Sequence, residues 1–258
     1  MSSRIRAIAF NTFREAVRDR VLYNLVIFAL LIVGSSLIFG KISIGIERLV
    51  LVNLGLTSIS LFGIVIAIFI GIGLVSKEID KKTLYTVLAR PVRRWEFIVG
   101  KFAGLTGTLT VNAGFMALGF FAALLYLTHK FVVADAYLVV ALYFIVLEFV
   151  LITALALLFS TFSSPLLSAV FAFSLFVIGT FAEDLRAFAA MSSGGTKIVA
   201  EALAWLVPNF AAFNVISQVA HAEAVAGRLI LYNTVYAVLY AAVCLSASVL
   251  IFERRDLK

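Results

Sequence analysis

Six long apolar runs constrain the fold of this chain more than any other feature of its sequence. They are 17 to 27 residues long and cover 22–39, 50–75, 102–128, 137–162, 166–182 and 229–252. About 20 apolar residues in a helix cross the roughly 30 Å of hydrocarbon in a bilayer. Strand-type alternation is absent, so barrel strands are excluded. We therefore predict an all-α polytopic membrane protein with six transmembrane helices in a single transmembrane domain, residues 1–258.

The basic residues between these runs predict the orientation of the chain. If the N-terminus is cytoplasmic, the inside segments hold fifteen of the 21 Lys and Arg residues and the outside segments hold six. Lys and Arg collect on the cytoplasmic side of membrane proteins. Both termini are thus expected in the cytoplasm, in a multi-pass protein of the inner (plasma) membrane. The net charge of +7 fits contact with anionic lipid headgroups, and no nucleic-acid partner is expected.

Two segments are expected to lie at the membrane surface. Residues 4–20, within the segment 1–21, place apolar side chains at helical spacing opposite arginines, which is typical of an interfacial helix. No cleavage motif follows Phe39, so the first run should remain as a span. The outer connection 183–228 is apolar yet interrupted by Pro208. We expect short re-entrant helices there, which dip into the outer leaflet or cap the bundle.

A basic segment, residues 76–96, separates the second and third apolar runs. It contains Lys77, Lys81, Lys82, Arg90, Arg93 and Arg94. Such a segment cannot lie in lipid, so it is expected to be a cytoplasmic element that a soluble partner can reach. It also offers an apolar patch of Leu84, Val87 and Leu88. A loop that served only orientation would not need this mixed pattern.

Two polar side chains lie deep inside the predicted spans, Asn112 in the third and Glu148 in the fourth. A charged group at that depth is expensive and should face protein or water and have a partner. The helical rise puts both residues at similar depth, which makes Asn112 a candidate partner of Glu148. A structural hydrogen bond between helices and a residue lining a substrate path both remain open for Glu148.

Small residues recur every fourth position in two spans. The second span has Gly63, Ala67 and Gly71, and the third has Gly100, Gly104 and Thr108. Rows of this kind let another helix approach closely. They predict tight helix packing and no particular activity.

The motifs of covalent chemistry are missing from the sequence. There is no phosphate-binding loop, since Gly100-Lys101 is followed by Phe102 and not by Ser or Thr. No zinc motif surrounds His129 or His221, no nucleophile elbow occurs, and Cys244 is the only cysteine. We expect a protein that is not an enzyme and that binds no cofactor or metal itself.

Several motifs, spread over nearly the whole chain, resemble those of a known family. The most specific lie at 11–15 (NTFRE), 18–20 (RDR), Glu78, 83–85 (TLY), 90–92 (RPV), 94–97 (RWEF) and 100–101 (GK), and weaker ones at 158–162 (LFSTF), 207–210 (VPNF) and 252–257. Together they resemble the membrane subunit of an ABC-2 type ABC exporter, especially the permeases grouped with multicopper-enzyme maturation systems. Lys82 departs from the pattern, because relatives commonly carry Gly there.

The resemblance implies partners and a site. In such exporters the loop between the second and third spans is a coupling helix that binds a soluble ABC ATPase subunit, which holds the ATP and Mg²⁺. The permease forms a homodimer, or a heterodimer with a related permease. The residues implied in coupling are Glu78, Lys82, Thr83, Leu84, Val87, Leu88, Arg90, Pro91, Arg93 and Arg94.

The sequence leaves two other functions open. One is an ATP-independent secondary transporter or channel that uses Glu148 as a proton or cation site. The other is a membrane anchor subunit that transports nothing. The class of substrate stays open under every interpretation.

Overall fold

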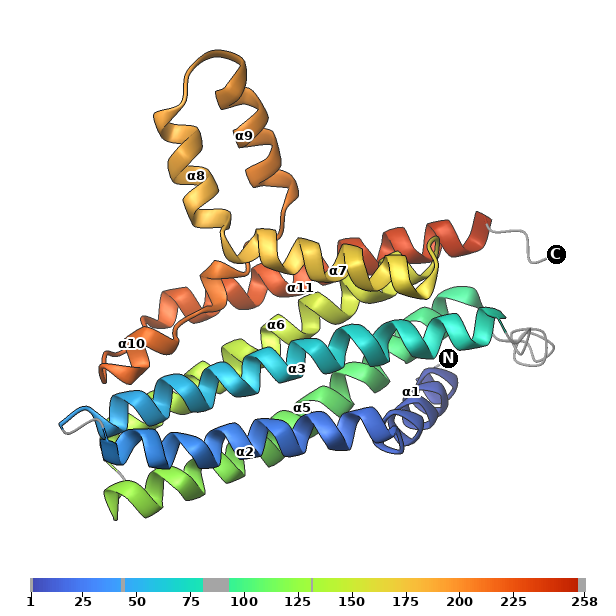
Figure 1. The fold of residues 1–258 in the computed structure, drawn as a ribbon. Coiled ribbons are helices and arrows are strands. Elements are labelled where there is room, and N and C mark those ends of the chain that lie inside the picture. Colours follow the sequence, from blue (N-terminus) through green and yellow to red (C-terminus); the bar gives the residue numbers. More distant parts are fainter. Residues whose placement is uncertain (1, 43–44, 81–92, 131, 255–258) are drawn as a thin grey trace.

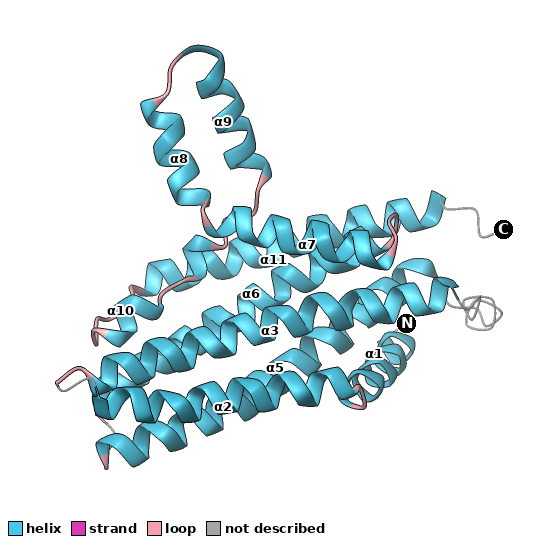
Figure 2. Cartoon of the chain, viewed as in Figure 1, coloured by secondary structure: helices cyan, strands magenta, loops and turns pink. Residues whose placement is uncertain are grey.

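The chain folds into a bundle of long helices, and its described residues contain no strand (Figure 2). The computed structural model describes residues 2–42, 45–80, 93–130 and 132–254 (Figure 1). The helices of the bundle are α1 (Ser2–Val17), α2 (Arg20–Ile42), α3 (Glu47–Asp80), α5 (Arg94–Thr128), α6 (Ala136–Ser160), α7 (Pro165–Thr180) and α11 (Gly227–Arg254). Shorter elements are η1 (Val133–Asp135), α8 (Ala182–Met191), α9 (Gly194–Leu206), η2 (Ala211–Phe213) and α10 (Ile216–Ala220).

The predicted polytopic all-α fold is confirmed. Each apolar run coincides with a helix of the bundle, α2, α3, α5, α6, α7 and α11 in chain order. Among the described residues, α3, α5, α6 and α11 are each long and apolar enough to cross a membrane. The number rises to six when each of two bent pairs, α1 with α2 and α7 with α8, is counted as one span.

Local chemistry explains where several helices begin and end. Pro165 is the first residue of α7. An N–H at this position has no acceptor within the helix, so its absence in proline costs no helical hydrogen bond. The end of α9 lies two residues before Pro208, because Pro disfavours helical geometry in the residue that precedes it. At the end of α5, His129 adopts a left-handed conformation with φ of 54°, and its N–H donates to the Leu125 carbonyl. This bond uses a carbonyl that the helix would otherwise leave free.

The helices α3 and α6 form the core of the bundle. They contact each other along their length, and α6 also packs against α5, α7 and α11. Gly63 of α3 faces the ring of Phe149 so closely that a Cβ atom there would lie 1.9 Å from its Cζ. Gly71 faces Ala156 two turns further on. The small-residue row of the second span is therefore the surface on which α6 packs, as small residues permit.

The fifth span is short and leads into a helical hairpin. With 16 residues, α7 is about 24 Å long, less than the hydrocarbon thickness. The chain then bends by 57° into α8. The helices α8 and α9 pack side by side as a hairpin that projects away from the bundle (Figure 1). The predicted break near Pro208 is thus the return of this hairpin to the bundle.

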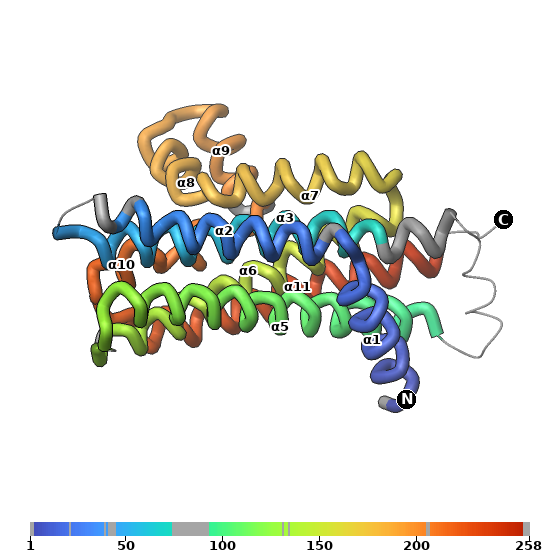
Figure 3. The backbone as a smooth tube through the Cα atoms, turned by 60° about the horizontal axis from the view of Figure 1, so that its bottom comes forward, coloured from blue at the N-terminus to red at the C-terminus, as the bar shows by residue number. Residues whose placement is uncertain are grey.

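The two ends of the bundle differ in what they carry. One end, called here the terminal end, holds α1, the last turn of α11, and the facing ends of α3 and α5 (Figures 1 and 3). The other, called the cap end, holds the start of α3, the start of α6 and α10 (Figure 1). Of the predicted coupling segment, residues 76–96, residues 81–92 lie outside the described residues, while 76–80 end α3 and 94–96 begin α5.

Candidate functional site

At the terminal end, α1 packs across the first turns of α5 (Figure 3). The contact lies on Gly100 and Gly104. A Cβ atom on Gly100 would come 2.7 Å from the side chain of Ile8, and one on Gly104 would come 2.5 Å from the Ala9 carbonyl oxygen. The two glycines of the small-residue row in the third span are therefore covered by α1, whereas Thr108 lies near α3.

Charged side chains reinforce this contact between α1 and α5. The side chain of Lys101 is only 2% exposed, its ammonium nitrogen lies 3.8 Å from a carboxylate oxygen of Glu15 in α1, and it lies 5.6 Å from the ring centroid of Phe97. Glu96 is equally buried, accepts a hydrogen bond from the Arg93 backbone N–H at 3.0 Å and lies 3.9 Å from a guanidinium nitrogen of Arg4. A buried charge needs such partners, because removal from water is costly.

The end of α11 joins the same turns of α5. Arg94 donates from one guanidinium nitrogen to the carbonyl oxygens of Phe252 at 2.6 Å and Glu253 at 2.9 Å. Its guanidinium group also lies over the Phe252 ring, which stacks on Phe97 at 6.0 Å between centroids. A cation is favourable at a helix C-terminus, where the last carbonyl groups lack partners in the helix. We call these contacts of α1, α5 and α11 the α5 junction.

Most of the residues predicted to contact an ATPase cannot be placed. Lys82, Thr83, Leu84, Val87, Leu88, Arg90 and Pro91 lie outside the described residues, and of Glu78 only the backbone, in the last turns of α3, is described. The two that are described differ. Arg93 is exposed, whereas Arg94 is half-buried and directs its guanidinium group at α11. The role of this set in coupling stays a prediction.

A second candidate site surrounds Glu148, near the middle of α6. Its carboxyl group accepts a hydrogen bond from the Ser60 hydroxyl of α3 at 2.7 Å. The group lines a cavity of about 160 Å³ between α3, α6, α7 and the segment from η2 to α10. The residue is 6% exposed, so the carboxyl group belongs to the interior of the bundle and not to its lipid-facing surface.

The predicted pairing of Glu148 with Asn112 is wrong. Asn112 is buried in α5, and its amide nitrogen has no hydrogen-bond partner in the described part of the chain, while Glu148 is bonded by Ser60. The estimate from helical rise gave the depth of both residues but not the direction in which each side chain points. Ser60 carried no distinguishing signal, because Thr57 and Ser58 lie beside it in the same span.

The roof of the cavity is tied to two helices. The N–H of Phe210 donates to the Gly179 carbonyl at the end of α7, at 3.1 Å. The N–H of Asn209 donates to the Tyr236 hydroxyl of α11 at 2.9 Å, and the Asn233 amide donates to the Ala212 carbonyl at 2.6 Å. The motif at 207–210, one of the weaker motifs in the sequence, is thus the start of this roof.

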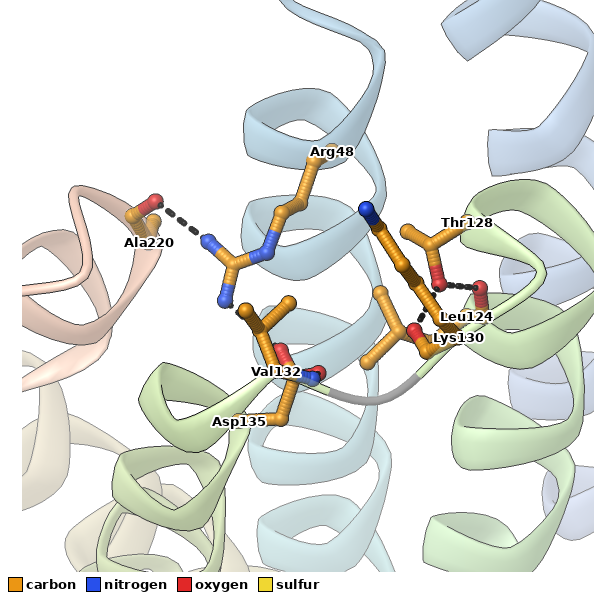
Figure 4. A network of polar contacts seen from close by, with 7 residues as sticks. All are labelled: Arg48, Leu124, Thr128, Lys130, Val132, Asp135 and Ala220. Carbon is orange, nitrogen blue, oxygen red and sulfur yellow. Dashed lines mark hydrogen bonds and ion pairs between the residues drawn. The ribbon is translucent and has the colours of Figure 1, made fainter.

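A polar latch closes the cap end (Figure 4). Arg48, in the first turn of α3, donates to the Asp135 carboxylate at 2.9 Å and to the Ala220 carbonyl, the last residue of α10, at 3.2 Å. Asp135 also accepts the Val132 N–H at 2.8 Å. We call these contacts the Arg48 latch. Arg48 and Asp135 are 87 residues apart and belong to no motif, so the sequence gives no signal for their pairing.

In the described ranges, no three His, Cys, Asp or Glu side chains form a group that could hold a metal ion. The described helices thus form a membrane-type bundle with a mostly apolar cavity into which the one carboxyl group of Glu148 projects. The chain belongs to the family described as ABC-2 family transporter protein, whose family model matches residues 6–257. It is therefore a transmembrane subunit of an ABC transporter. No curated protein matches the chain.

Proposed function

We propose that this subunit works in an ATP-driven exporter and that residues 76–96 couple it to a separate ATP-hydrolysing subunit, which would bind the ATP and Mg²⁺. The substrate would move outward through the membrane domain, from the cytoplasm or the inner leaflet. The observation that carries this proposal is the α5 junction. It includes the last residues of the basic segment, Arg94 and Glu96, so that a force on the segment reaches three helices at once.

The length of α5 supports a mechanical role. With 35 residues it is about 52 Å long, so its first turns extend well beyond a hydrocarbon core of roughly 30 Å. At its start it is bonded to α11 through Arg94 and packed on α1 through Gly104. Further along, it contacts α3 and α6, which line the Glu148 cavity. A tilt of α5 driven from its start would therefore change the helices around the cavity.

Coupling of this kind requires two arrangements that differ in their contacts, because a ligand shifts an equilibrium only through its differential affinity for two states. The polar contacts of the α5 junction and of the Arg48 latch are suited to being made in one arrangement and broken in another. We propose that the permease acts as a homodimer or with a related permease, and that each copy binds one ATPase subunit.

The coupling proposal is tested by a charge reversal in the basic segment. We expect the double variant Leu84→Asp with Arg90→Glu to insert normally, and the amount of partner ATPase that co-purifies with it in detergent to fall at least tenfold. Loss of the apolar patch lowers the affinity for the ATPase, and loss of a complementary charge disturbs the alignment of the segment on it.

The matched control carries the same chemical changes at the cap end. Val133→Asp with Lys130→Glu alters one exposed apolar side chain and one exposed basic side chain there, and should leave ATPase binding unchanged. Full association of the Leu84/Arg90 variant would contradict the proposal. So would transport by the subunit in proteoliposomes without any ATPase, which would favour a secondary transporter that uses Glu148.

A further inference from the structure

The Glu148 cavity contains a carboxyl group whose charge nothing else in the described part of the chain balances. No ion pair involves Glu148 there, and its one hydrogen bond comes from the neutral hydroxyl of Ser60. That bond occupies Oε2, which leaves Oε1 available to a molecule in the cavity. A carboxylate inside a membrane domain requires a counter-charge. Either a proton or a bound cation has to supply it.

The walls of the cavity favour an organic cation. Three phenylalanine rings line it, those of Phe176, Phe210 and Phe213, and two of them, Phe176 and Phe210, meet edge to face at 5.2 Å. The face of an aromatic ring attracts cations through its quadrupole, and such rings surround quaternary ammonium ligands in known sites. A metal ion such as Na⁺ would instead need several oxygen ligands. Besides Glu148 and Ser60, the lining includes Thr57, Thr180 and Asn214, and the last two already form hydrogen bonds with the backbone of Phe176 and Ile216.

The size of the cavity limits the cation. At about 160 Å³ it is close to an engineered cavity of roughly 150 Å³ that accepts benzene. It can therefore hold a group of roughly five or six non-hydrogen atoms, such as the trimethylammonium head of choline. The cavity lies between α3, α6, α7 and the segment from η2 to α10, which forms its roof.

We propose that this cavity is a binding site for a small monovalent organic cation, whose ammonium group pairs with Glu148 and contacts the three phenylalanine rings. The cation is either free or the head of a larger substrate. This inference rests on the proposed function, because it names the substrate class of the membrane pathway. Its test uses no ATPase and no transport, so its failure and a failure of ATP coupling are read separately.

The test compares a cation with its neutral isostere. The full chain is reconstituted in nanodiscs of zwitterionic lipid, and binding of choline and of 3,3-dimethyl-1-butanol is measured by saturation-transfer NMR titration. The two probes have nearly the same shape and differ in charge. We expect choline to bind at least tenfold more tightly than the neutral alcohol. Equal binding of the two would overturn the proposal, because it would show an apolar cavity without charge selection.

Two variants test the residues of the site. Glu148→Gln keeps the shape of the side chain and removes its charge, so choline affinity should fall at least tenfold while the midpoint of thermal unfolding stays within a few degrees. Phe176→Leu removes a ring from the cavity wall and should weaken choline binding severalfold. Phe173→Leu is its matched control, since Phe173 lies on the same helix, is half exposed and does not line the cavity.

Three outcomes would contradict the cation site. Unchanged choline affinity in Glu148→Gln would show that Glu148 carries a proton and serves structure only. An equal effect of Phe173→Leu and Phe176→Leu would place the probe in the lipid or on the outer surface of α7. Competition of choline binding by Na⁺, with K⁺ as the ionic-strength control, would assign the cavity to a metal ion.

Discussion

Arg48 holds three separate segments together at the cap end, and it is the side chain whose loss should disturb that end most. Its guanidinium group is partly buried and satisfies a buried carboxylate and a backbone carbonyl at once (Figure 4). Planar guanidinium groups suit such double contacts, because their donors are held in a fixed fork. The geometry makes Arg48 the residue that keeps α10, and with it the cavity roof, against α3 and α6.

We expect Arg48→Ala to destabilise the protein by about 1–3 kcal/mol, because it leaves the Asp135 carboxylate buried without its partner. Asp135→Ala should cost a similar amount, and the double variant less than the sum of the two. The measurement is a double-mutant cycle of unfolding free energies in detergent.

A second ion pair provides the control for this cycle. Lys197 and Glu201 form a pair one helical turn apart in α9, 3.8 Å between charged atoms, and both side chains are about half exposed. Such pairs contribute about 0.3–0.5 kcal/mol. An Arg48–Asp135 coupling energy no larger than that of this pair would show that the latch does not hold the cap end.

At the scale of elements, the docking of α1 on α5 depends on the absence of side chains at two positions of α5. Gly104→Ala would bring a Cβ atom to 2.5 Å from the Ala9 carbonyl oxygen and 2.7 Å from Thr12 Cβ, so α1 would have to move. We expect this variant to lose about 1–3 kcal/mol, as overpacked interfaces do. Thermal unfolding in detergent, with a spin-label distance between α1 and α5, measures both consequences.

Gly107 is the matched control, one turn further along α5. A Cβ atom there meets nothing within 4 Å, so Gly107→Ala should be neutral or stabilise the helix by up to about 1 kcal/mol. If both variants were equally stable and left the α1–α5 distance unchanged, the close contact at Gly104 would not be what holds α1 in place.

The elements of this fold could be predicted from sequence where a single physical constraint decides them. The apolar runs located six of the seven described helices of the bundle, because only a helix satisfies its backbone in lipid. The small-residue rows at Gly63 and Gly100 predicted close approach but not the partner. Helix periodicity shows which face of a helix carries the small residues but not what covers that face. The structure shows that α1, which the sequence predicted as an interfacial helix, covers Gly100.

The candidate site was harder to predict than the elements. Glu148 stood out as the deep carboxylate of the sequence, since charge in an apolar run is rare. Its partner, Ser60, and the rings of Phe176 and Phe213 could not be found, because their positions depend on the rotation of α3 and α7 about their axes. The Arg48 latch depends on the same unknown rotations and on a loop that brings Asp135 to α3.

At the scale of the whole molecule, the two ends of the bundle have opposite characters. The terminal end carries the arginines of α1 and the α5 junction, and the cap end carries the Arg48 latch and the roof of the cavity (Figure 1). A transporter that takes energy from a soluble partner at one end and releases substrate at the other needs such a difference. The excess of Lys and Arg in the segments at the terminal end predicts that this end is cytoplasmic.

Orientation in the membrane is therefore the prediction on which the proposed mechanism depends as a whole. With Cys244 replaced by Ser, single cysteines at Ser3 and at Glu223 report on opposite ends, since both positions are exposed. A membrane-impermeant maleimide added to intact spheroplasts should label Glu223→Cys, and should label Ser3→Cys only after the membrane is opened. Because the α5 junction contains α1, labelling of Ser3→Cys in intact spheroplasts would put the junction and the basic segment outside the cell, where no ATP-hydrolysing subunit could drive them.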